Sequence, residues 1–264
     1  MPVLVIGATG NVGRHVMAGL QSAGVPVRGT SRTPDGDALV RLDVDDRAML
    51  MAALDGVEKV FLYARPESIA TFVSAARSAG VKHVVLLSSA SVVDPATRHS
   101  VSSSRHAAVE GALRESGIAW TFLRPTTFAG LNLRSAGQIR AGGVVRGPFL
   151  DVRIASIHER DIADVAVRAL TSTGHEEQAY WLTGPQALTL RRHIEVIGEV
   201  IGRPVEVAEV APEDLDPKPT ESFVRNMTEL LKAECVVTPA VEEVTGVPAR
   251  TFRQWVEDHI EDFR

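Results

Sequence analysis

The chain has 264 residues, of which 45% are hydrophobic, and a formal net charge of −5 at pH 7. No apolar run approaches the roughly 20 residues of a membrane helix, and the 28 Lys and Arg residues are scattered rather than clustered. We therefore expect neither a membrane nor a nucleic-acid partner. A single cysteine, Cys235, excludes an internal disulfide, and because no Cys/His cluster is present we expect no metal site. The N-terminus does not resemble a signal peptide, so the cytoplasm is the expected location.

The first 125 residues alternate short apolar runs with segments of helical spacing. The apolar runs predict buried strands at residues 3–6, 25–30, 40–44, 59–64, 82–88 and 119–123. Helical spacing predicts helices over residues 14–23, 45–54, 68–79 and 102–116. Because strands alternate with helices of this length, we expect βαβ units and an α/β fold, with a Rossmann-type doubly wound parallel sheet.

After Pro125 this alternation stops. Residues 130–147 contain five glycines and predict a loop with a short helix; a helix over 162–170, introduced by Asp161, and a strand at 179–182 follow. From Leu188 the pattern is mostly helical, with a strand-like stretch at 204–210, a proline-rich connector at 212–219 and an amphipathic helix over 251–263. We expect residues 1–130 and 151–184 to form the dinucleotide-binding core, and residues 131–150 and 185–264 a smaller substrate lobe.

A glycine-rich loop follows the first expected strand and opens the first expected helix. It reads Gly7, Ala8, Thr9, Gly10, Asn11, Val12 and Gly13. In a dinucleotide-binding turn the first glycine permits the sharp bend, the second lets the backbone approach the pyrophosphate, and the third lets the helix pack closely on the sheet. The unsatisfied N–H groups at the start of the helix then bind the phosphates. The loop therefore predicts a dinucleotide cofactor.

The end of the second expected strand distinguishes NAD from NADP. NAD enzymes usually carry an acid there for the ribose 2′-hydroxyl, but this chain has Ser31, Arg32 and Thr33. The planar guanidinium of Arg32 can bind a 2′-phosphate, with Ser31 adding a hydroxyl contact, so NADP(H) is favoured; otherwise Arg32 is a solvated loop residue. Asp43, with Val44 beside it, either meets the adenine edge or caps the next helix.

With these residues in view, the chain resembles the NmrA-like, atypical short-chain dehydrogenase/reductases over nearly its whole length. The resemblance rests on GATGNVG at 7–13, Ser31-Arg32, LDVDD at 42–46, LLSSAS at 86–91, VEGALRESGIAWTFLRPTTF at 109–128, Asp161-Ile162-Ala163, WLTGPQALTL at 181–190 and TFRQWVEDHI at 251–260. It implies an NADPH-binding core with the nicotinamide near the carboxyl ends of the strands. The residues that it implies there are Tyr63, Ala64, Arg65 and Pro66, then Ser88 and Ser89, then Pro125, Thr126 and Thr127.

Catalytic short-chain dehydrogenases carry a Tyr and a Lys four residues apart on the helix before the Leu-Arg-Pro strand, on one helix face. Counted back from Glu110, which resembles the family's glutamate, the Tyr position holds Ser102 and the Lys position holds His106. Three alternatives remain open. His106 donates the proton, Ser89 or Ser102 orients a carbonyl while solvent supplies the proton, or no chemistry occurs and His106 is a polar helix residue.

Two functions follow from these alternatives. The first is an NADPH-dependent reductase of a quinone, ketone or similar electrophilic small molecule, in which positioning matters more than a proton donor. Its substrate would contact apolar side chains at Phe128, Leu131, Phe149, Phe223 and Met227. The second is a non-catalytic NADP(H) sensor that controls a partner protein. The sequence leaves the oligomeric state undetermined.

Overall fold

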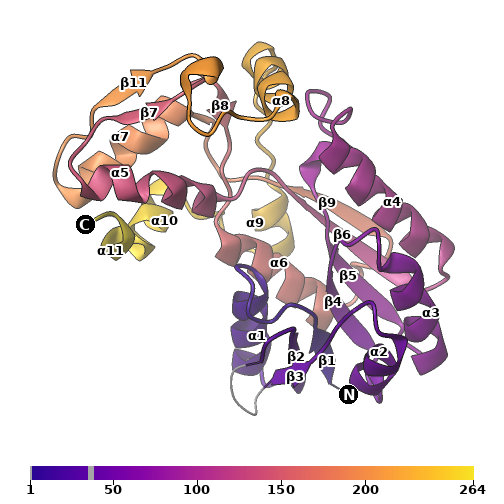
Figure 1. Cartoon of the computed structure of the whole chain (residues 1–264). Helices are drawn as coiled ribbons and strands as arrows, with labels where there is room; N and C mark the ends of the chain where they lie inside the picture. Colours follow the sequence, from indigo (N-terminus) through magenta and orange to yellow (C-terminus); the bar gives the residue numbers. More distant parts are fainter. Residues whose placement is uncertain (1, 35–38) are drawn as a thin grey trace.

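The computed structural model describes residues 2–34 and 39–264, which form a seven-stranded sheet with a smaller lobe beside it (Figure 1). All seven strands are parallel, in the order β3-β2-β1-β4-β5-β6-β9. They are β1 (Val3–Val5), β2 (Val27–Ser31), β3 (Leu39–Arg41), β4 (Lys59–Tyr63), β5 (His83–Leu87), β6 (Ala119–Pro125) and β9 (Gln178–Leu182). The strand order reverses between β1 and β4, where sheets of this kind bind ligands at their carboxyl edge. The predicted Rossmann-type sheet is confirmed.

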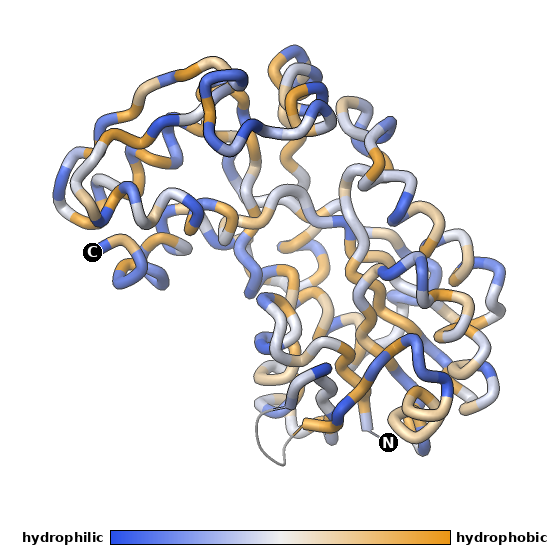
Figure 2. The backbone as a smooth tube through the Cα atoms, viewed as in Figure 1, coloured by the Kyte–Doolittle hydropathy of each residue, from blue (hydrophilic) through white to orange (hydrophobic). Residues whose placement is uncertain are grey.

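Helices cover both faces of the sheet because alternate strand residues point to opposite sides. Leu4 and Val60 pack with α2, α3 and α4 on one face, whereas Val5 and Phe61 pack with α1, α6 and α9 on the other. These helices are α1 (Gly13–Ser22), α2 (Arg47–Leu54), α3 (Ile69–Ala79), α4 (Val101–Glu115), α6 (Glu159–Thr171) and α9 (Ala240–Thr245). The hydrophobic strands lie between the two layers (Figure 2). Thus α9, although late in the chain, packs against the core.

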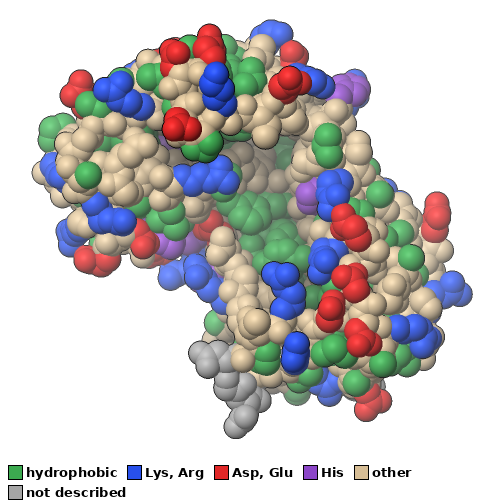
Figure 3. All heavy atoms as spheres, in the orientation of Figure 1, with side chains coloured by type: hydrophobic (Ala, Val, Ile, Leu, Met, Phe, Trp, Pro, Cys, Tyr) green, Lys and Arg blue, Asp and Glu red, His purple; other side chains and the backbone are tan. Residues whose placement is uncertain are grey.

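The smaller lobe has a hydrophobic cluster of its own, centred on the fully buried Trp255. It comprises α5 (Ala136–Arg140), α7 (Leu190–Ile201), α10 (Phe252–Asp258), α11 (Ile260–Phe263) and the parallel strand pair β7 (Val145–Gly147) and β11 (Val207–Glu209). Figure 3 shows the molecule hollowed between this lobe and the core, with hydrophobic side chains on the floor of the hollow. The expected, mostly helical C-terminal lobe is therefore present.

The remaining elements lie at the junction of core and lobe or connect the two. They are the 3₁₀ helices η1 (Ala90–Val92), η2 (Ala129–Ser135) and η3 (Pro212–Asp214), the antiparallel pair β8 (Arg153–Ile154) and β10 (Leu188–Thr189), and α8 (Glu221–Lys232). Only Met227 of α8 is buried. Within residues 2–34 and 39–264, no helix is both long and apolar enough to cross a membrane.

Three helices differ from the sequence expectations by more than one residue at an end, each because of a side chain there. The first, α2, starts after Asp46, whose carboxylate accepts the N–H groups of the first turn. The second, α6, starts three residues early because the imidazole of His158 accepts the Arg160 N–H. The expected helix over 251–263 is broken at His259, whose ring stacks on Trp255. The break redirects the last turn so that Phe263 becomes fully buried.

Candidate active site

Two cavities open near the carboxyl ends of the strands. The glycine-loop cavity, of about 590 Å³, is lined by Ile6, Gly7, Thr9, Gly10, Asn11, Thr30, Ser31, Arg32, Thr33, Leu42, Val44, Tyr63, Arg65 and Phe128. The hydroxyl cavity, of about 270 Å³, is lined on its core side by η1, the start of α4 and the end of β6, and on its lobe side by β8, α8 and residues 234–236. The segment after β6 contributes to both, because Pro125 to Thr127 line the hydroxyl cavity and Phe128 lines the glycine-loop cavity.

The glycine loop has the geometry that its sequence predicts. Gly7 has a positive φ of 74°, and a Cβ placed on Gly13 would lie 2.1 Å from the carbonyl oxygen of Gly7. The loop is closed by a hydrogen bond from the Gly10 N–H to the Gly7 carbonyl (3.0 Å). Val12 is fully buried at the N-cap position of α1 and offers no side-chain acceptor. The N-cap residue of α1 therefore provides no side-chain acceptor for the first N–H groups of the helix, as is usual where a phosphate binds there.

Tyr63 lies directly on this loop. Its hydroxyl accepts a hydrogen bond from the Gly13 N–H (3.3 Å), and its ring is close enough that a Cβ on Gly10 would lie 2.8 Å from the hydroxyl oxygen. Burial raises the pKa of this phenol, so it is neutral at physiological pH. The resemblance implied that Tyr63 lies by the nicotinamide. The structure places the ring against Gly10 and Gly13, because β4 is the direct neighbour of β1.

The end of β2 contributes hydroxyl and guanidinium groups to the same cavity. Ser31 is buried and its hydroxyl accepts the Thr33 N–H (3.2 Å), with the Thr9 hydroxyl 3.5 Å away. The side chain of Arg32 is exposed at the cavity wall. An exposed cation beside two hydroxyls fits a phosphate monoester. These are the groups that a 2′-phosphate would contact.

Beyond Arg32, the wall of the glycine-loop cavity includes the apolar side chains of Leu42 and Val44. Asp43 is exposed and is not among the lining residues; its carboxylate accepts the Asp45 N–H (3.1 Å). The alternative role for Asp43, capping the next helix, belongs to Asp46 instead. Arg65 lines the cavity and lies 3.5 Å from the Asp45 carboxylate, whereas Ala64 packs into the core.

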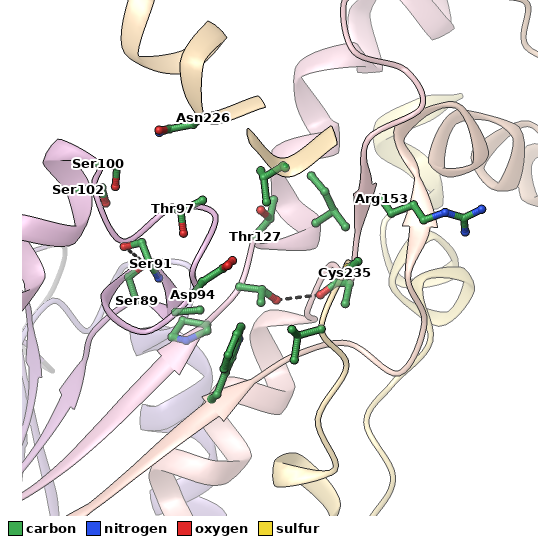
Figure 4. A pocket seen from close by; sticks show the side chains of 18 of the residues that line it. Ser89, Ser91, Asp94, Thr97, Ser100, Ser102, Thr127, Arg153, Asn226 and Cys235 are labelled. Carbon is green, nitrogen blue, oxygen red and sulfur yellow. Dashed lines mark hydrogen bonds between the residues drawn. The ribbon is translucent and has the colours of Figure 1, made fainter. Parts of the chain in front are cut away.

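The hydroxyl cavity has two unlike walls (Figure 4). The polar wall lies on the core side and carries Ser89, Ser91, Asp94, Thr97, Ser100 and Ser102. The apolar wall lies mostly on the lobe side and carries Ile154, Ala155, Leu230, Cys235 and Val236, with Asn226 of α8 beside them, and Pro125 and Trp181 add apolar surface from the ends of β6 and β9. Several hydroxyls of the polar wall are already engaged. The hydroxyls of Ser89 and Ser91 lie 2.9 Å apart, and the Thr126 hydroxyl donates to the Ala155 carbonyl (2.8 Å). Ser100 caps α4.

The structure brings Ser89 and Ser102 to one cavity but leaves His106 and Ser88 outside it. His106 lies one turn beyond Ser102 on α4, and its Nδ1 is 2.8 Å from the Ser102 carbonyl oxygen and 3.5 Å from the Ser102 hydroxyl. Ser88 is buried and donates its hydroxyl to Glu110 (2.7 Å). Ser88 therefore supports the polar wall from behind.

Some apolar residues expected in the substrate wall lie elsewhere. Phe149 packs edge-on against Phe223, and Met227 packs with Val152 and Ile154 in a small cluster beneath α8. Instead, Asn226 and Leu230 of α8 reach the hydroxyl cavity. The sequence alone could not distinguish the residues that reach the cavity from those that do not, because only one face of α8 lines it.

A buried carboxylate beneath the hydroxyl cavity holds together the elements that form its walls, and the sequence did not reveal this role. Glu110 is fully buried and accepts hydrogen bonds from Ser88, from two nitrogens of Arg124 (2.9 and 2.6 Å) and from Arg114 (3.2 Å). It thereby ties α4 to the ends of β5 and β6, from which the cavity walls begin. In the sequence, Glu110 served only to locate Ser102 and His106 along the same helix.

Comparisons with known proteins agree with this geometry. A family described as NAD(P)H-binding matches residues 7–173. The chain is 39% identical to the (4-alkanoyl-5-oxo-2,5-dihydrofuran-3-yl)methyl phosphate reductase of Streptomyces griseus, over 99% of both proteins. It is 34% identical to the NAD(P)H azoreductase of Xenophilus azovorans, again over 99% of both.

A solved structure extends the comparison to a bound cofactor. The NADPH-dependent quinone oxidoreductase of Escherichia coli, crystallised with NADPH, superposes with a TM-score of 0.81 at 26% identity, over 97% of this chain and 99% of that one. The predicted NADP(H) cofactor agrees with that structure and with the matched family. This chain therefore belongs to the NAD(P)H-binding family, within the NmrA-like, atypical short-chain dehydrogenase/reductase superfamily of oxidoreductases.

Proposed function

We propose that the chain is an NADPH-dependent reductase of a quinone, ketone or similar electrophilic small molecule. The observation that carries this proposal is the junction of the two cavities at residues 125–128. One side of this segment faces the glycine loop and the other faces a cavity with polar and apolar walls. A segment that lines both cavities would hold a cofactor in one cavity close to an acceptor in the other, as hydride transfer requires.

The cofactor's binding residues follow from the glycine-loop cavity. We assign the pyrophosphate to the N–H groups at Asn11, Val12 and Gly13, and the 2′-phosphate to Arg32 with Ser31 and Thr9. Further contacts are proposed for Gly7, Gly10, Val44, the ring of Tyr63, Arg65, Pro125 and Thr126. Asp43, Ala64 and Ser88 line neither cavity, so the sequence-based assignment of these three residues to the cofactor is not kept. The division into a cofactor core, residues 1–130 and 151–184, and a substrate lobe, residues 131–150 and 185–264, belongs to the same proposal, except that α9 packs with the core.

When bound, the cofactor supplies a hydride to the acceptor. The chain's own groups orient the acceptor and deliver a proton. We propose that Ser89 and Ser102 hydrogen-bond the acceptor from the polar wall, because both line the hydroxyl cavity. His106 would supply the proton through the Ser102 hydroxyl, which lies 3.5 Å from its Nδ1. Relatives named as reductases of a furanone phosphate, of azo compounds and of quinones support an electron-poor acceptor.

A second candidate function is a non-catalytic NADP(H) sensor. The observation that favours it is the presence of Ser102 and His106 at the positions where the resemblance expects Tyr and Lys. In this case the cofactor would change the position of the lobe for a partner protein, and the hydroxyl cavity would not bind an acceptor.

NADPH oxidation with a panel of quinones, ketones and azo compounds separates the two functions. Turnover that is lost in Gly10→Asp, whose carboxylate would enter the phosphate site, supports the reductase. NADPH binding without turnover of any acceptor supports the sensor. Arg32→Ala should weaken NADPH binding by about tenfold or more while leaving NADH nearly unchanged, since one charge-assisted phosphate contact is lost. Equal rates in wild type and His106→Ala would remove His106 from the mechanism.

A further inference from the structure

The carboxylate of Glu159 is buried between the core and the lobe. Glu159 is the first residue of α6, which begins where the core meets the lobe (Figure 1), and its side chain is only 5% exposed. One carboxylate oxygen accepts the Gly130 N–H (2.8 Å), and the other accepts the indole N–H of Trp255 (3.1 Å). A single side chain therefore joins the segment after β6 to the centre of the lobe.

The negative charge of Glu159 is stabilised by N–H groups rather than by a cation. Among the residues that the structure describes, the basic side chain within 4 Å of the carboxylate is His158, whose Nδ1 lies 3.6 Å away. That nitrogen accepts the Arg160 N–H (3.1 Å), and burial lowers the pKa of His158 from 6.5 to about 4, so the ring is neutral. A hydrophobic side chain could fill the same space without the cost of an unpaired buried charge. Packing alone therefore does not account for a carboxylate at this position.

Gly130 lies two residues beyond Phe128, in the segment that contributes to both cavities. Backbone hydrogen bonds pair residues 127–129 with Ile157, and Phe128 lines the glycine-loop cavity. A Cβ built on Gly130 would collide with the Glu159 carboxylate, so only a glycine allows this close approach. The backbone pairing and the carboxylate together fix the position of Phe128 relative to the start of α6.

The lobe side of the contact is also fixed to the start of α6. Trp255 is fully buried at the centre of the hydrophobic cluster of the lobe. One turn later on α10, Asp258 accepts the Nε2–H of His158 (3.1 Å) and pairs with Arg160 (2.9 Å). Because these two residues of α10 lie on consecutive turns, the lobe and the first turn of α6 are held together as one unit.

We propose that Glu159 is a positioning residue for hydride transfer, which holds the segment after β6 at a fixed distance from the lobe and so sets the separation of cofactor and acceptor. This inference rests on the proposed reductase function and adds a residue to it. Glu159 lines neither cavity and acts through Gly130 on Phe128. A displacement of about 1 Å can lower a rate about a hundredfold, so a small shift of this segment is sufficient.

Glu159→Gln tests this role with the smallest change of shape. The amide oxygen can still accept one N–H, but the amide nitrogen then faces the other donor, so one of the two links is lost. The measurement is the rate constant of NADPH oxidation in a single turnover, followed by stopped flow with naphthoquinone as the acceptor. This rate constant should fall about tenfold or more, while the Kd of NADPH stays within about twofold. A fraction of misfolded enzyme would lower the amplitude of the single turnover but not its rate constant.

A second variant and a matched control separate positioning from stability. Trp255→Phe removes the indole N–H and should lower the same rate constant, and combining it with Glu159→Gln should lower it no further than Glu159→Gln alone, because both changes break one link. Asp161→Asn is the control, since Asp161 is a buried carboxylate of the same helical turn that accepts the Arg250 N–H (2.9 Å) instead of one from the segment after β6. It should lower Tm without changing the rate constant.

A rate constant within about twofold of wild type in Glu159→Gln, or an equal fall in Asp161→Asn, overturns the proposal. If Glu159→Gln does not fold, an unchanged rate constant in Trp255→Phe overturns it instead. If wild type turns over no acceptor, the reductase function fails separately, and the link is then tested by the indole N–H signal of Trp255 in a proton–nitrogen NMR spectrum. NADP⁺ should shift this signal in wild type, although Trp255 lines neither cavity, and should not shift it in Glu159→Gln. Equal shifts in the two proteins, or no shift in wild type, refute the link.

Discussion

Replacing Glu110 with glutamine should destabilise the fold more than any single surface change. The carboxylate is fully buried, and its main partner, Arg124, has a side chain only 12% exposed. In Glu110→Gln the amide keeps the shape of the side chain but removes its charge. The amide nitrogen also becomes a donor facing the guanidinium donors of Arg124. The guanidinium is then left buried without its counter-charge.

The magnitude follows from which contacts are lost. Breaking one partner of a buried, hydrogen-bonded ion pair costs about 3 to 5 kcal/mol. We expect the lower end, about 3 kcal/mol, since one amide oxygen remains as an acceptor and Arg114, which is 45% exposed, can turn to water. For a chain of this size, this corresponds to a fall in Tm of about 6 to 12 °C.

Chemical denaturation followed by circular dichroism measures this loss directly. Glu67→Gln is the matched control, because it makes the same substitution at an ion pair with Arg105 in which both side chains are about half exposed. Such a pair contributes little, and the control should match wild type. A loss below about 1 kcal/mol in Glu110→Gln would show that Arg124 reaches solvent when its partner is neutral, and would refute the burial argument.

Three further predictions concern the glycine loop and one buried histidine. In Tyr63→Phe the hydroxyl that accepts the Gly13 N–H is gone, so NADPH should bind about twofold to tenfold more tightly by fluorescence titration; weaker binding would mean that the hydroxyl contacts the cofactor. Gly13→Ala places a Cβ 2.1 Å from the Gly7 carbonyl oxygen and should abolish NADPH binding, whereas Gly111→Ala, with nothing within 4 Å, should leave binding and Tm nearly unchanged or raise Tm. Burial lowers the pKa of His193 from 6.5 to about 4, so between these values the unfolded chain binds a proton that the folded chain does not, and stability is lost as pH falls through this window. His193→Gln should therefore reduce the stability lost between about pH 7 and 5 by about 2 kcal/mol, measured by urea unfolding; an unchanged pH profile would show that His193 is protonated in the fold.

The sequence by itself was sufficient for the features that depend on local order along the chain. Alternating apolar runs and helical segments predicted the parallel sheet, because strand periodicity and helix spacing are local properties. The loop from Gly7 to Gly13 could be located because its glycines are required by backbone geometry that any dinucleotide turn shares. Arg32 could be located directly after β2 because the residue that distinguishes NAD from NADP also has a fixed place in this fold.

The tertiary structure alone decided which side chains share a cavity. Tyr63 lies on Gly10, more than fifty positions away, because β1 and β4 pair. Asp94 and Cys235 line one cavity because the segment after α8 returns to the carboxyl ends of the strands. Conversely, His106 and Asp43 are close in sequence to lining residues but lie outside the cavities. Residue spacing along the chain determines which residues share one face of a helix or strand. The distance between two elements depends instead on strand order and on how the lobe packs, and these arise only when the whole chain has folded.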